Sequence, residues 1–316
     1  MAISSPIQND GDRVTMLGTI GKPSLLRNCL HSEEYEETIA ACSLVDAEQT
    51  MRIDTDKQDG EGLNMKNISD QDNGPVRSGS RSEAASEDTA LEARSLSKVY
   101  DSAAGRVTAL RDVSFKVKKG EFVAIVGPSG SGKSTLLNLI GAIDRPTSGK
   151  VIIDGVDVFA LGNQEIAKMR NNLIGFIFQS YNLINRTTVL RNVELPAIVM
   201  GIDRVERRNR ALKVLEVLGI VDKASYKPTS LSGGQQQRVA IARSLMNNPA
   251  IILADEPTGN LDTKTGNEVF GLLKMLSHKF RRTIFMVTHN PELADTTDRA
   301  IYFRDGAIEK EVLNQG

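Results

Sequence analysis

The chain has 316 residues, 40% of them hydrophobic and 25% charged, a composition typical of one large folded domain or two small ones. Its longest apolar runs, such as residues 251–254, are far shorter than the roughly 20 residues of a membrane-spanning helix, and the N-terminus lacks the pattern of a secretion signal. We therefore expect a cytoplasmic chain that does not itself cross a bilayer. Both cysteines, Cys29 and Cys42, lie in the N-terminal part, which excludes a disulfide or a thiolate metal site in the main body.

The net charge of −1 conceals an acidic N-terminal part. Residues 1–92 hold 8 Lys or Arg against 18 Asp or Glu, whereas residues 93–316 hold 31 basic against 22 acidic side chains. Only 11 of the 47 residues from 46 to 92 are apolar, too few for burial to offset the entropy of the chain. We expect residues 1–92 to be an acidic, disordered extension and residues 93–316 to be the folded domain. Two alternatives stay open, a transient helix on a partner at residues 24–45 and a start of translation at Met65.

From Arg94 onward, short apolar strands alternate with helical periodicity, which is typical of a mostly parallel sheet covered by helices. A buried strand is predicted at residues 121–126, and a helix follows it with one apolar face. Further strands are predicted at residues 151–153, 174–178, 250–254 and 283–287. Residues 181–246 lack clear strands and predict an inserted helical subdomain, in which Gly219 ends a helix. The apolar face of the helix after the first strand consists of Leu136, Leu139, Ile140 and Ile143.

A glycine-rich loop lies between that predicted strand and helix and matches the phosphate-loop pattern GxxxxGK[ST]. Glycines let backbone N–H groups converge on phosphate oxygens, while Lys133 adds a positive charge and Ser134 a ligand for Mg²⁺. The loop therefore predicts binding of a tetra-anionic nucleotide. The residues expected to bind it are Gly127, Pro128, Ser129, Gly130, Ser131, Gly132, Lys133, Ser134 and Thr135.

Two carboxylates, Asp255 and Glu256, directly follow the apolar run at residues 250–254. This position places them at the carboxyl edge of the sheet, where open α/β folds bind ligands. We expect Asp255 to hold Mg²⁺ through its water shell and Glu256 to orient or deprotonate the attacking water. An acidic pair after a strand is more often a solvated turn, so it is the phosphate loop that favours the catalytic interpretation.

A second glycine-rich loop opens a predicted helix and consists of Leu231, Ser232, Gly233, Gly234 and Gln235. With this LSGGQ sequence, the chain resembles the ATP-binding-cassette (ABC) ATPases over residues 93–313. The resemblance implies an α/β fold with a P-loop NTPase core of mostly parallel sheet, an antiparallel β subdomain and an inserted helical subdomain. It also implies ATP and Mg²⁺, and a head-to-tail homodimer in which the LSGGQ helix of one subunit faces the γ-phosphate held by the other.

The resemblance implies roles for four further positions. Tyr100 matches the aromatic that stacks on adenine, and Gln179 matches the glutamine that touches magnesium and water and senses the membrane partner. Asp262 matches the loop that contacts the opposite subunit. His289 matches the switch histidine, which bonds the γ-phosphate and supports the catalytic carboxylate, Glu256. The implied catalytic residues are thus Glu256, His289 and Gln179, and the implied metal ligands are Ser134, Gln179 and Asp255.

Within the superfamily, residues 179–184, 192–196 and 252–262 look most like the lipoprotein-release, macrolide-export and FtsE-type group. Arg191, where an acidic residue is common, and the acidic extension depart from that group and put the identity of the partner in doubt. The resemblance implies an ATPase subunit that drives separately encoded, integral membrane permease subunits through a groove around residues 179–200. Such a subunit would be peripheral on the cytoplasmic face of the membrane.

Other functions stay open. Soluble ABC ATPases of chromosome organisation are disfavoured because too few residues separate Lys133 from Leu231 for a long coiled coil. Those of DNA repair or translation are disfavoured by the single cassette without a cysteine cluster. The interleaved charges at residues 204–208 are typical of a solvated helix face, so no nucleic-acid partner is expected. A signalling ATPase of the FtsE type uses the same residues and is not separated from a transporter. The acidic extension either docks intermittently on the folded domain and slows dimer closure, or is an inert solubilising segment.

Overall fold

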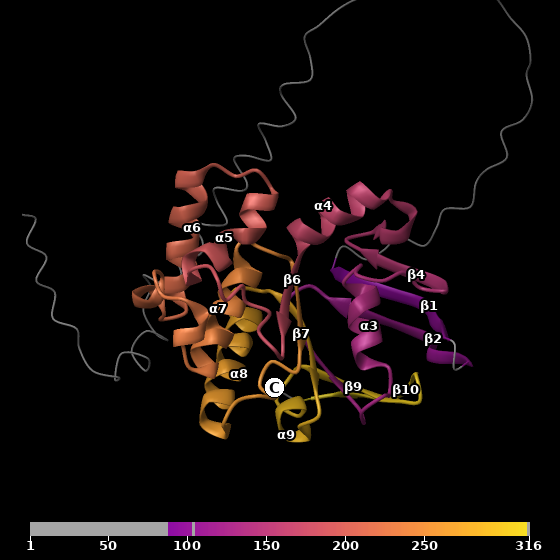
Figure 1. Ribbon diagram of the computed structural model, residues 1–316. Helices are drawn as coiled ribbons and strands as arrows, with labels where there is room; N and C mark the ends of the chain where they lie inside the picture. The colour runs from indigo at the N-terminus through magenta and orange to yellow at the C-terminus, as the bar shows by residue number, and fades with distance from the viewer. Residues whose placement is uncertain (1–87, 103–104, 315–316) are drawn as a thin grey trace, which may run out of the picture.

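The computed structural model describes residues 88–102 and 105–314 (Figure 1). A six-stranded sheet in the order β10-β9-β3-β8-β7-β6 forms its centre. Five of its strands are parallel, and β10 runs antiparallel to β9. The strands predicted at residues 121–126, 174–178, 250–254 and 283–287 are confirmed as β3, β6, β7 and β8. The bounds are β3 (Phe122–Val126), β6 (Ile174–Phe178), β7 (Ile251–Asp255), β8 (Thr283–Thr288), β9 (Arg299–Arg304) and β10 (Ala307–Leu313).

A second, antiparallel sheet has the order β2-β1-β4-β5. In Figure 1, helix α3 lies between the two sheets. The strand predicted at residues 151–153 is the second half of β4. The bounds are β1 (Thr89–Ser102), β2 (Gly105–Lys118), β4 (Ser148–Ile153) and β5 (Val156–Asp157), which a short 3-10 turn, η1 (Val158–Ala160), follows.

The start of the folded domain differs from the expected one. Strand β1 begins at Thr89, and Ala90 and Leu91 are buried in the core, so a boundary after residue 92 is wrong by four residues. The strand begins earlier because Leu91 packs into the core cluster that the antiparallel sheet shares with the central sheet, a tertiary contact that the polar composition around it hides. Residues 1–87, with both cysteines and Met65, lie outside the described residues, and their expected disorder stays a prediction.

The helices group on both faces of the central sheet. Helix α4 continues the layer of α3, and α5, α6, α7 and α8 stack together beyond the opposite face (Figure 1). Residues 181–246 contain α5, α6, α7 and two 3-10 turns and no strand, and α6 ends two residues before Gly219, whose φ is +65°. The α/β class with an antiparallel sheet and a helical insertion is therefore confirmed. The bounds are α3 (Lys133–Ile140), α4 (Asn163–Leu173), α5 (Val189–Val199), α6 (Arg204–Val217), η2 (Val221–Lys223), η3 (Pro228–Ser230), α7 (Gly233–Leu245), α8 (Thr263–His278) and α9 (Pro291–Ala294).

Alternation along the central strands divides the apolar core between the two faces. On β7, Ile251 and Leu253 join the cluster that includes α3 and the antiparallel sheet, whereas Ile252 and Ala254 join the cluster of α5 to α8. Successive side chains of a strand point to opposite faces, so one continuous apolar run fills both layers. Among the described residues, no helix is both long enough and apolar enough to cross a membrane.

Candidate active site

The phosphate loop joins β3 directly to α3, and its glycines have conformations that other residues rarely adopt. Gly130 and Gly132 have φ angles of +78° and +100°. A Cβ on Gly132 would lie 2.5 Å from the carbonyl oxygen of Ala109 in β2, so the loop fits against that strand only with glycine there. This path leaves the N-terminus of α3, with its unpaired N–H groups, at the loop.

Lys133 holds the loop from within. Its Nζ donates hydrogen bonds to the carbonyl oxygens of Gly127 (2.8 Å) and Pro128 (2.7 Å), and the residue is only 8% exposed. Burial lowers the pKa of Lys133, while the carboxylates of Glu256 and Asp255 oppose that shift. The ammonium is therefore largely shielded from water and lies near two negative charges. A bound phosphate would give it a strong hydrogen-bond acceptor.

The loop opens into a cavity of about 440 Å³ that brings together groups from four strands. Glu256 follows β7 and His289 follows β8, and both line the cavity, with 3.4 Å between His289 Nδ1 and Glu256 Oε2. Glu256 has a φ of +45°, which is uncommon for a residue other than glycine, and its N–H donates to the carbonyl oxygen of Val287 at 3.1 Å. The lining consists of Val107, Thr108, Ala109, Gly127, Pro128, Ser129, Gly130, Gly132, Lys133, Ser134, Thr135, Glu256 and His289.

The residues expected to bind Mg²⁺ lie near Glu256. Asp255 forms a side-chain hydrogen bond with Ser134; burial and the negative charge of Glu256 raise the pKa of Asp255. Gln179, after β6, approaches from the other side: a Cβ on Gly259 would lie 2.8 Å from Gln179 Nε2 and 3.3 Å from Glu256 Oε2. Hydroxyl, carboxylate and amide oxygens suit Mg²⁺, and Asp255 is a buried carboxyl next to a second carboxylate, so the residues fit the ion.

Tyr100 lies at the edge of this arrangement. It sits in β1 opposite Val107, its hydroxyl donates to Asp144 Oδ2 at 2.8 Å, and the Nζ of Lys98 lies 4.8 Å from its ring centre. Tyr100 is not among the residues that line the cavity, whereas Val107, Thr108 and Ala109 are. The sequence analysis missed these three residues of β2. These residues belong to the antiparallel sheet and contact the loop that follows a strand of the central sheet. No local sequence pattern predicts this contact.

The raised pKa of Asp255 predicts how the nucleotide-free protein responds to pH. Because the fold disfavours the ionised carboxyl, the folded state binds this proton more readily than the unfolded state, and stability rises as pH falls through the raised pKa. We expect Asp255→Asn to melt at a higher temperature than wild type at pH 7 in EDTA, and this difference to shrink as pH falls. Thermal melts of both proteins at pH 7 and at successively lower pH measure both effects.

Asp262→Asn is the matched control for that experiment. Hydrogen bonds from Thr265 lower the pKa of Asp262, so its ionised form is favoured by folding, and removing the charge brings no gain in melting temperature at pH 7. Equal shifts in the two variants would contradict the assignment of the effect to the burial of Asp255 and the nearby negative charge of Glu256.

The LSGGQ loop is built as the start of α7. The Ser232 side chain accepts a hydrogen bond from the N–H of Gln235 (3.4 Å), and Gln235 Oε1 accepts one from the N–H of Ser232 (3.0 Å). Leu231 is buried beneath it. Asp262 caps α8 through the N–H of Thr265 (3.1 Å), and Thr265 in turn packs on Gly234. None of the residues 231–235 and 262 lines the phosphate-loop cavity of the same chain.

Gly234 leaves no room for a side chain. A Cβ there would lie 2.2 Å from Cγ2 of Thr265, so we expect Gly234→Ala to destabilise the protein by about 1–3 kcal/mol through overpacking. Because Thr265→Ser removes that methyl group, the double variant Gly234→Ala/Thr265→Ser is expected to regain most of the loss. Urea unfolding of the three variants measures it, and a double variant as unstable as the single glycine variant would contradict the steric explanation.

A two-residue turn between β9 and β10 supports the phosphate loop from below. Asp305 and Gly306 have φ angles of +50° and +81°, the geometry of an Asp-Gly hairpin turn. The N–H of Gly306 donates to the carbonyl oxygen of Ser131 (3.1 Å), and the N–H of Arg111 donates to that of Gly306 (2.8 Å). The loop is thus held by segments far from it in sequence.

A parallel sheet, a phosphate loop opening a helix and two carboxylates at the neighbouring strand end together define a P-loop nucleoside triphosphatase. The sequence model of the family described as "ABC transporter" matches residues 110–259. The chain is 55% identical to an uncharacterized ABC transporter ATP-binding protein of Thermotoga maritima over 212 residues, which cover 67% of this chain and 90% of that protein. The chain therefore belongs to the ABC transporter ATP-binding proteins, and it is an ABC-type ATPase.

Two further relatives extend the comparison. The ABC transporter cassette MJ0796 of Methanocaldococcus jannaschii, solved as a dimer, has a TM-score of 0.67 and 47% identity and covers 72% of this chain and 99% of its own. A second structure of that cassette is a post-hydrolysis state with ADP and Pi. The macrolide export ATP-binding/permease protein MacB of Vibrio parahaemolyticus is 45% identical over 227 residues. These residues cover 72% of this chain and 35% of MacB, so the chain spans about a third of that longer protein.

Proposed function

We infer that two copies of this chain close head to tail over two ATP molecules and that hydrolysis of ATP drives membrane subunits of a transporter. One observation carries the catalytic part: Glu256, held beside His289, lies in the same cavity as the phosphate loop. The LSGGQ residues lie outside that cavity, so in this arrangement they serve the nucleotide of the other copy. The dimer of the cassette MJ0796, 47% identical to this chain, supports the pairing.

The residues of this chain divide the work of hydrolysis. The N–H groups of the loop and Lys133 hold the phosphates, while Glu256 orients the attacking water and accepts its proton. His289 positions the Glu256 carboxylate from 3.4 Å. Mg²⁺, when bound by Ser134, Asp255 and Gln179, neutralises charge on the phosphate oxygens. Binding contacts that form only across the closed dimer favour closure, and their loss after hydrolysis reopens it.

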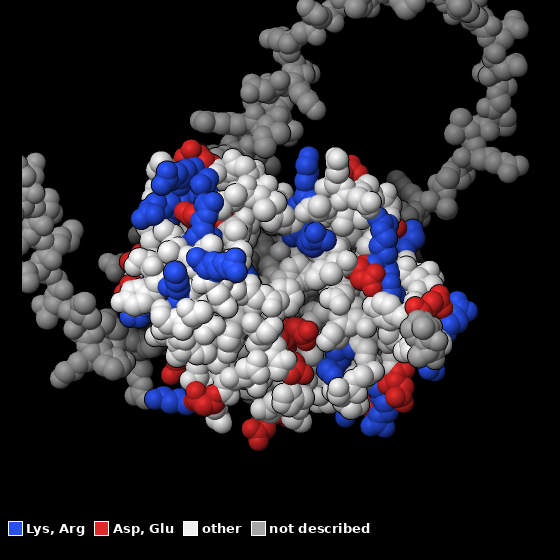
Figure 2. Space-filling model, in the orientation of Figure 1, with Lys and Arg blue, Asp and Glu red and all other residues white. Residues whose placement is uncertain are grey.

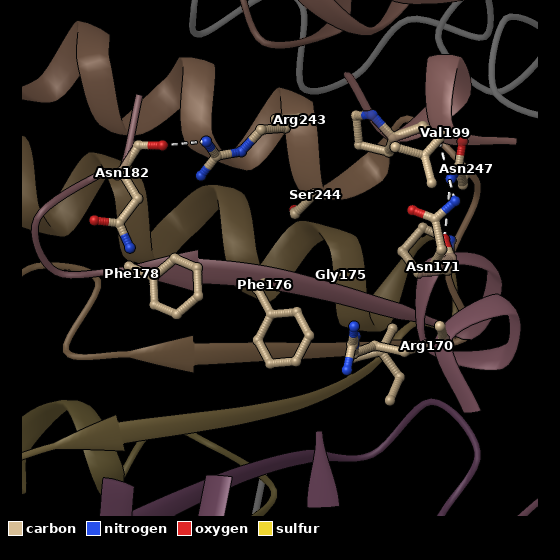
Figure 3. A pocket seen from close by; sticks show the side chains of 14 residues that line it. Arg170, Asn171, Gly175, Phe176, Phe178, Asn182, Val199, Arg243, Ser244 and Asn247 are labelled. Carbon is tan, nitrogen blue, oxygen red and sulfur yellow. Dashed lines mark hydrogen bonds between the residues drawn. The ribbon is translucent and has the colours of Figure 1, made fainter. Parts of the chain in front are cut away.

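A second cavity, of about 530 Å³, lies between α4, β6, α5 and α7 and is the proposed docking groove for the membrane subunit (Figure 3). Phe176 and Phe178 stack side by side on its floor with 5.8 Å between ring centres. Arg243 lines it from α7 and is held by the carbonyl oxygen of Asn182, while Val199 lines it from the end of α5. Gln179, an expected metal ligand, directly follows Phe178. An element bound in this groove would therefore contact the residue next to that ligand.

Site-specific crosslinking in native membranes tests the docking. Cys29 and Cys42 are first replaced by Ser, and a single cysteine is then placed at Val199 or, as a control, at the exposed Lys274 of α8. We expect the Val199→Cys protein, and not the Lys274→Cys protein, to crosslink to one integral membrane protein. A crosslink at neither position, or equally at both, would contradict the groove as the docking site.

A further inference from the structure

The connection between α5 and α6 carries exposed apolar side chains, and we call residues 199–208 the α5–α6 tip. Val199 is 76% exposed, Met200 44% and Val205 66%. A single exposed apolar side chain is ordinary, but three within seven residues at the end of a helical hairpin form a small apolar surface that water solvates poorly.

Basic side chains surround these apolar ones. Arg204 and Arg208 are exposed one turn apart on α6, and no ion pair holds either of them in the part of the chain that the structure describes. Glu206 is paired with Arg210, and the exposed Asp203 accepts a hydrogen bond from the N–H of Val205, so the tip holds three arginines against two carboxylates. Figure 2 shows Lys and Arg gathered over α6 at the upper left of the molecule. The tip therefore combines positive charge with apolar surface, as segments that lie on membrane surfaces do.

We propose that the α5–α6 tip docks on the anionic surface of a lipid bilayer. The proposal rests on the proposed function, because Val199 belongs both to the tip and to the lining of the groove for the membrane subunit. A subunit seated in that groove holds the neighbouring tip close to the membrane. Arginines then reach lipid phosphates while Met200 and Val205 enter the interface between headgroups and acyl chains, and Val199 stays against the membrane subunit.

The acidic N-terminal residues are the competing occupant, and the apolar side chains argue against them. Residues 1–87 hold 16 acidic and 8 basic residues, so they also complement the arginines in charge. Residues 46–87 are mostly polar, however, and would leave the apolar part of the tip in water, whereas the more apolar residues 24–45 are distinguished by the crosslinking described below. The Debye length is about 8 Å at physiological salt, so only basic side chains that lie close to the membrane, such as Arg204 and Arg208 of the tip, contribute to its attraction.

Vesicle co-sedimentation of the full chain tests the proposal. The vesicles contain phosphatidylcholine alone or with about 30% phosphatidylglycerol, which supplies the negative surface potential. We expect binding to the anionic vesicles only, weakened by salt. Arg204→Glu/Arg208→Glu should lower the affinity by about 30-fold or more, because each basic residue near such a surface contributes about fivefold and the new carboxylates are in addition repelled by it. Lys118→Glu/Lys274→Glu changes the charge equally on exposed residues outside the tip and should bind as wild type does.

Two further measurements make the result specific. Val205→Ser keeps the charge and should still weaken binding, and ATP turnover in solution should be unchanged in the arginine pair, which shows that the fold is intact. The proposal is overturned by absence of wild-type binding to anionic vesicles, by equal losses in the two charge-reversed pairs, or by crosslinking of the tip to residues 1–87 in the presence of vesicles. Because the vesicles contain no protein, none of these results depends on docking in the groove.

Discussion

The Glu256→Gln protein is expected to bind ATP with an affinity close to that of wild type and to hydrolyse it about 10²–10⁴-fold more slowly, the usual contribution of a positioned general base. The amide has nearly the shape of the carboxylate, so residue 256 can keep its φ of +45°. The amide does not, however, accept a proton. Since hydrolysis is then blocked after closure, the variant should accumulate as a dimer with ATP. Turnover assays and size-exclusion chromatography with and without ATP measure the two effects.

His289→Ala is the companion variant. It leaves the carboxylate in place and removes the group 3.4 Å from Glu256 Oε2, so we expect a loss of turnover that is not additive with Glu256→Gln. Turnover by Glu256→Gln at the wild-type rate would exclude Glu256 as the base. Additive losses in the double variant would contradict a joint action of the two side chains.

Lys133→Ala is expected to weaken ATP binding about 10–100-fold, because charge-assisted hydrogen bonds to phosphate oxygens disappear. Calorimetric titration with ATP measures the change. The loop also loses the ammonium that joins the carbonyl oxygens of Gly127 and Pro128, so an altered loop is a second explanation for a loss.

Lys133→Met loses the same two hydrogen bonds to the carbonyl oxygens of Gly127 and Pro128, and its melting temperature tests whether the loop stays folded without the ammonium. It fills the volume of the lysine stem without its charge, and burial no longer costs the desolvation that lowers the pKa of Lys133. We expect the methionine variant to melt at or above the wild-type temperature without nucleotide and still to bind ATP as weakly as Lys133→Ala. Near wild-type ATP affinity in the methionine variant would exclude the ammonium as a phosphate ligand.

The sequence predicted those parts of the fold and the site that depend on local signals. A strand, a glycine loop and a helix follow one another at residues 121–140, so the phosphate loop needed no tertiary information. Glu256 could be placed near it because parallel strands end at one edge of a sheet, whereas His289 was placed through the resemblance to the ABC ATPases; β3, β8 and β7 are adjacent in that order. The apolar runs of β7 and β8 made the ends of these two strands easy to locate.

The parts that were missed depend on contacts between distant segments. Val107 to Ala109 line the cavity because the antiparallel sheet packs across the loop, which no pattern within β2 indicates. Ala90 and Leu91 lie in a polar stretch of the sequence, and their place in a strand depends on the burial of their side chains in the folded domain. The hairpin of β9 and β10 was not predicted either, although Asp305-Gly306 is a strong local signal for such a turn.

That hairpin turn also bears on the order in which the protein becomes functional during synthesis. The turn at Gly306 donates a hydrogen bond to Ser131, and Gly127 packs against the carbonyl of Phe303, so the phosphate loop gains its final support from residues translated long after it. Because β9 lies directly beside β3 in the sheet, a nascent chain that has released only the loop and the LSGGQ helix lacks a strand next to its nucleotide site. We therefore expect affinity for ATP to arise late on the ribosome, after β9 and β10 have been synthesised.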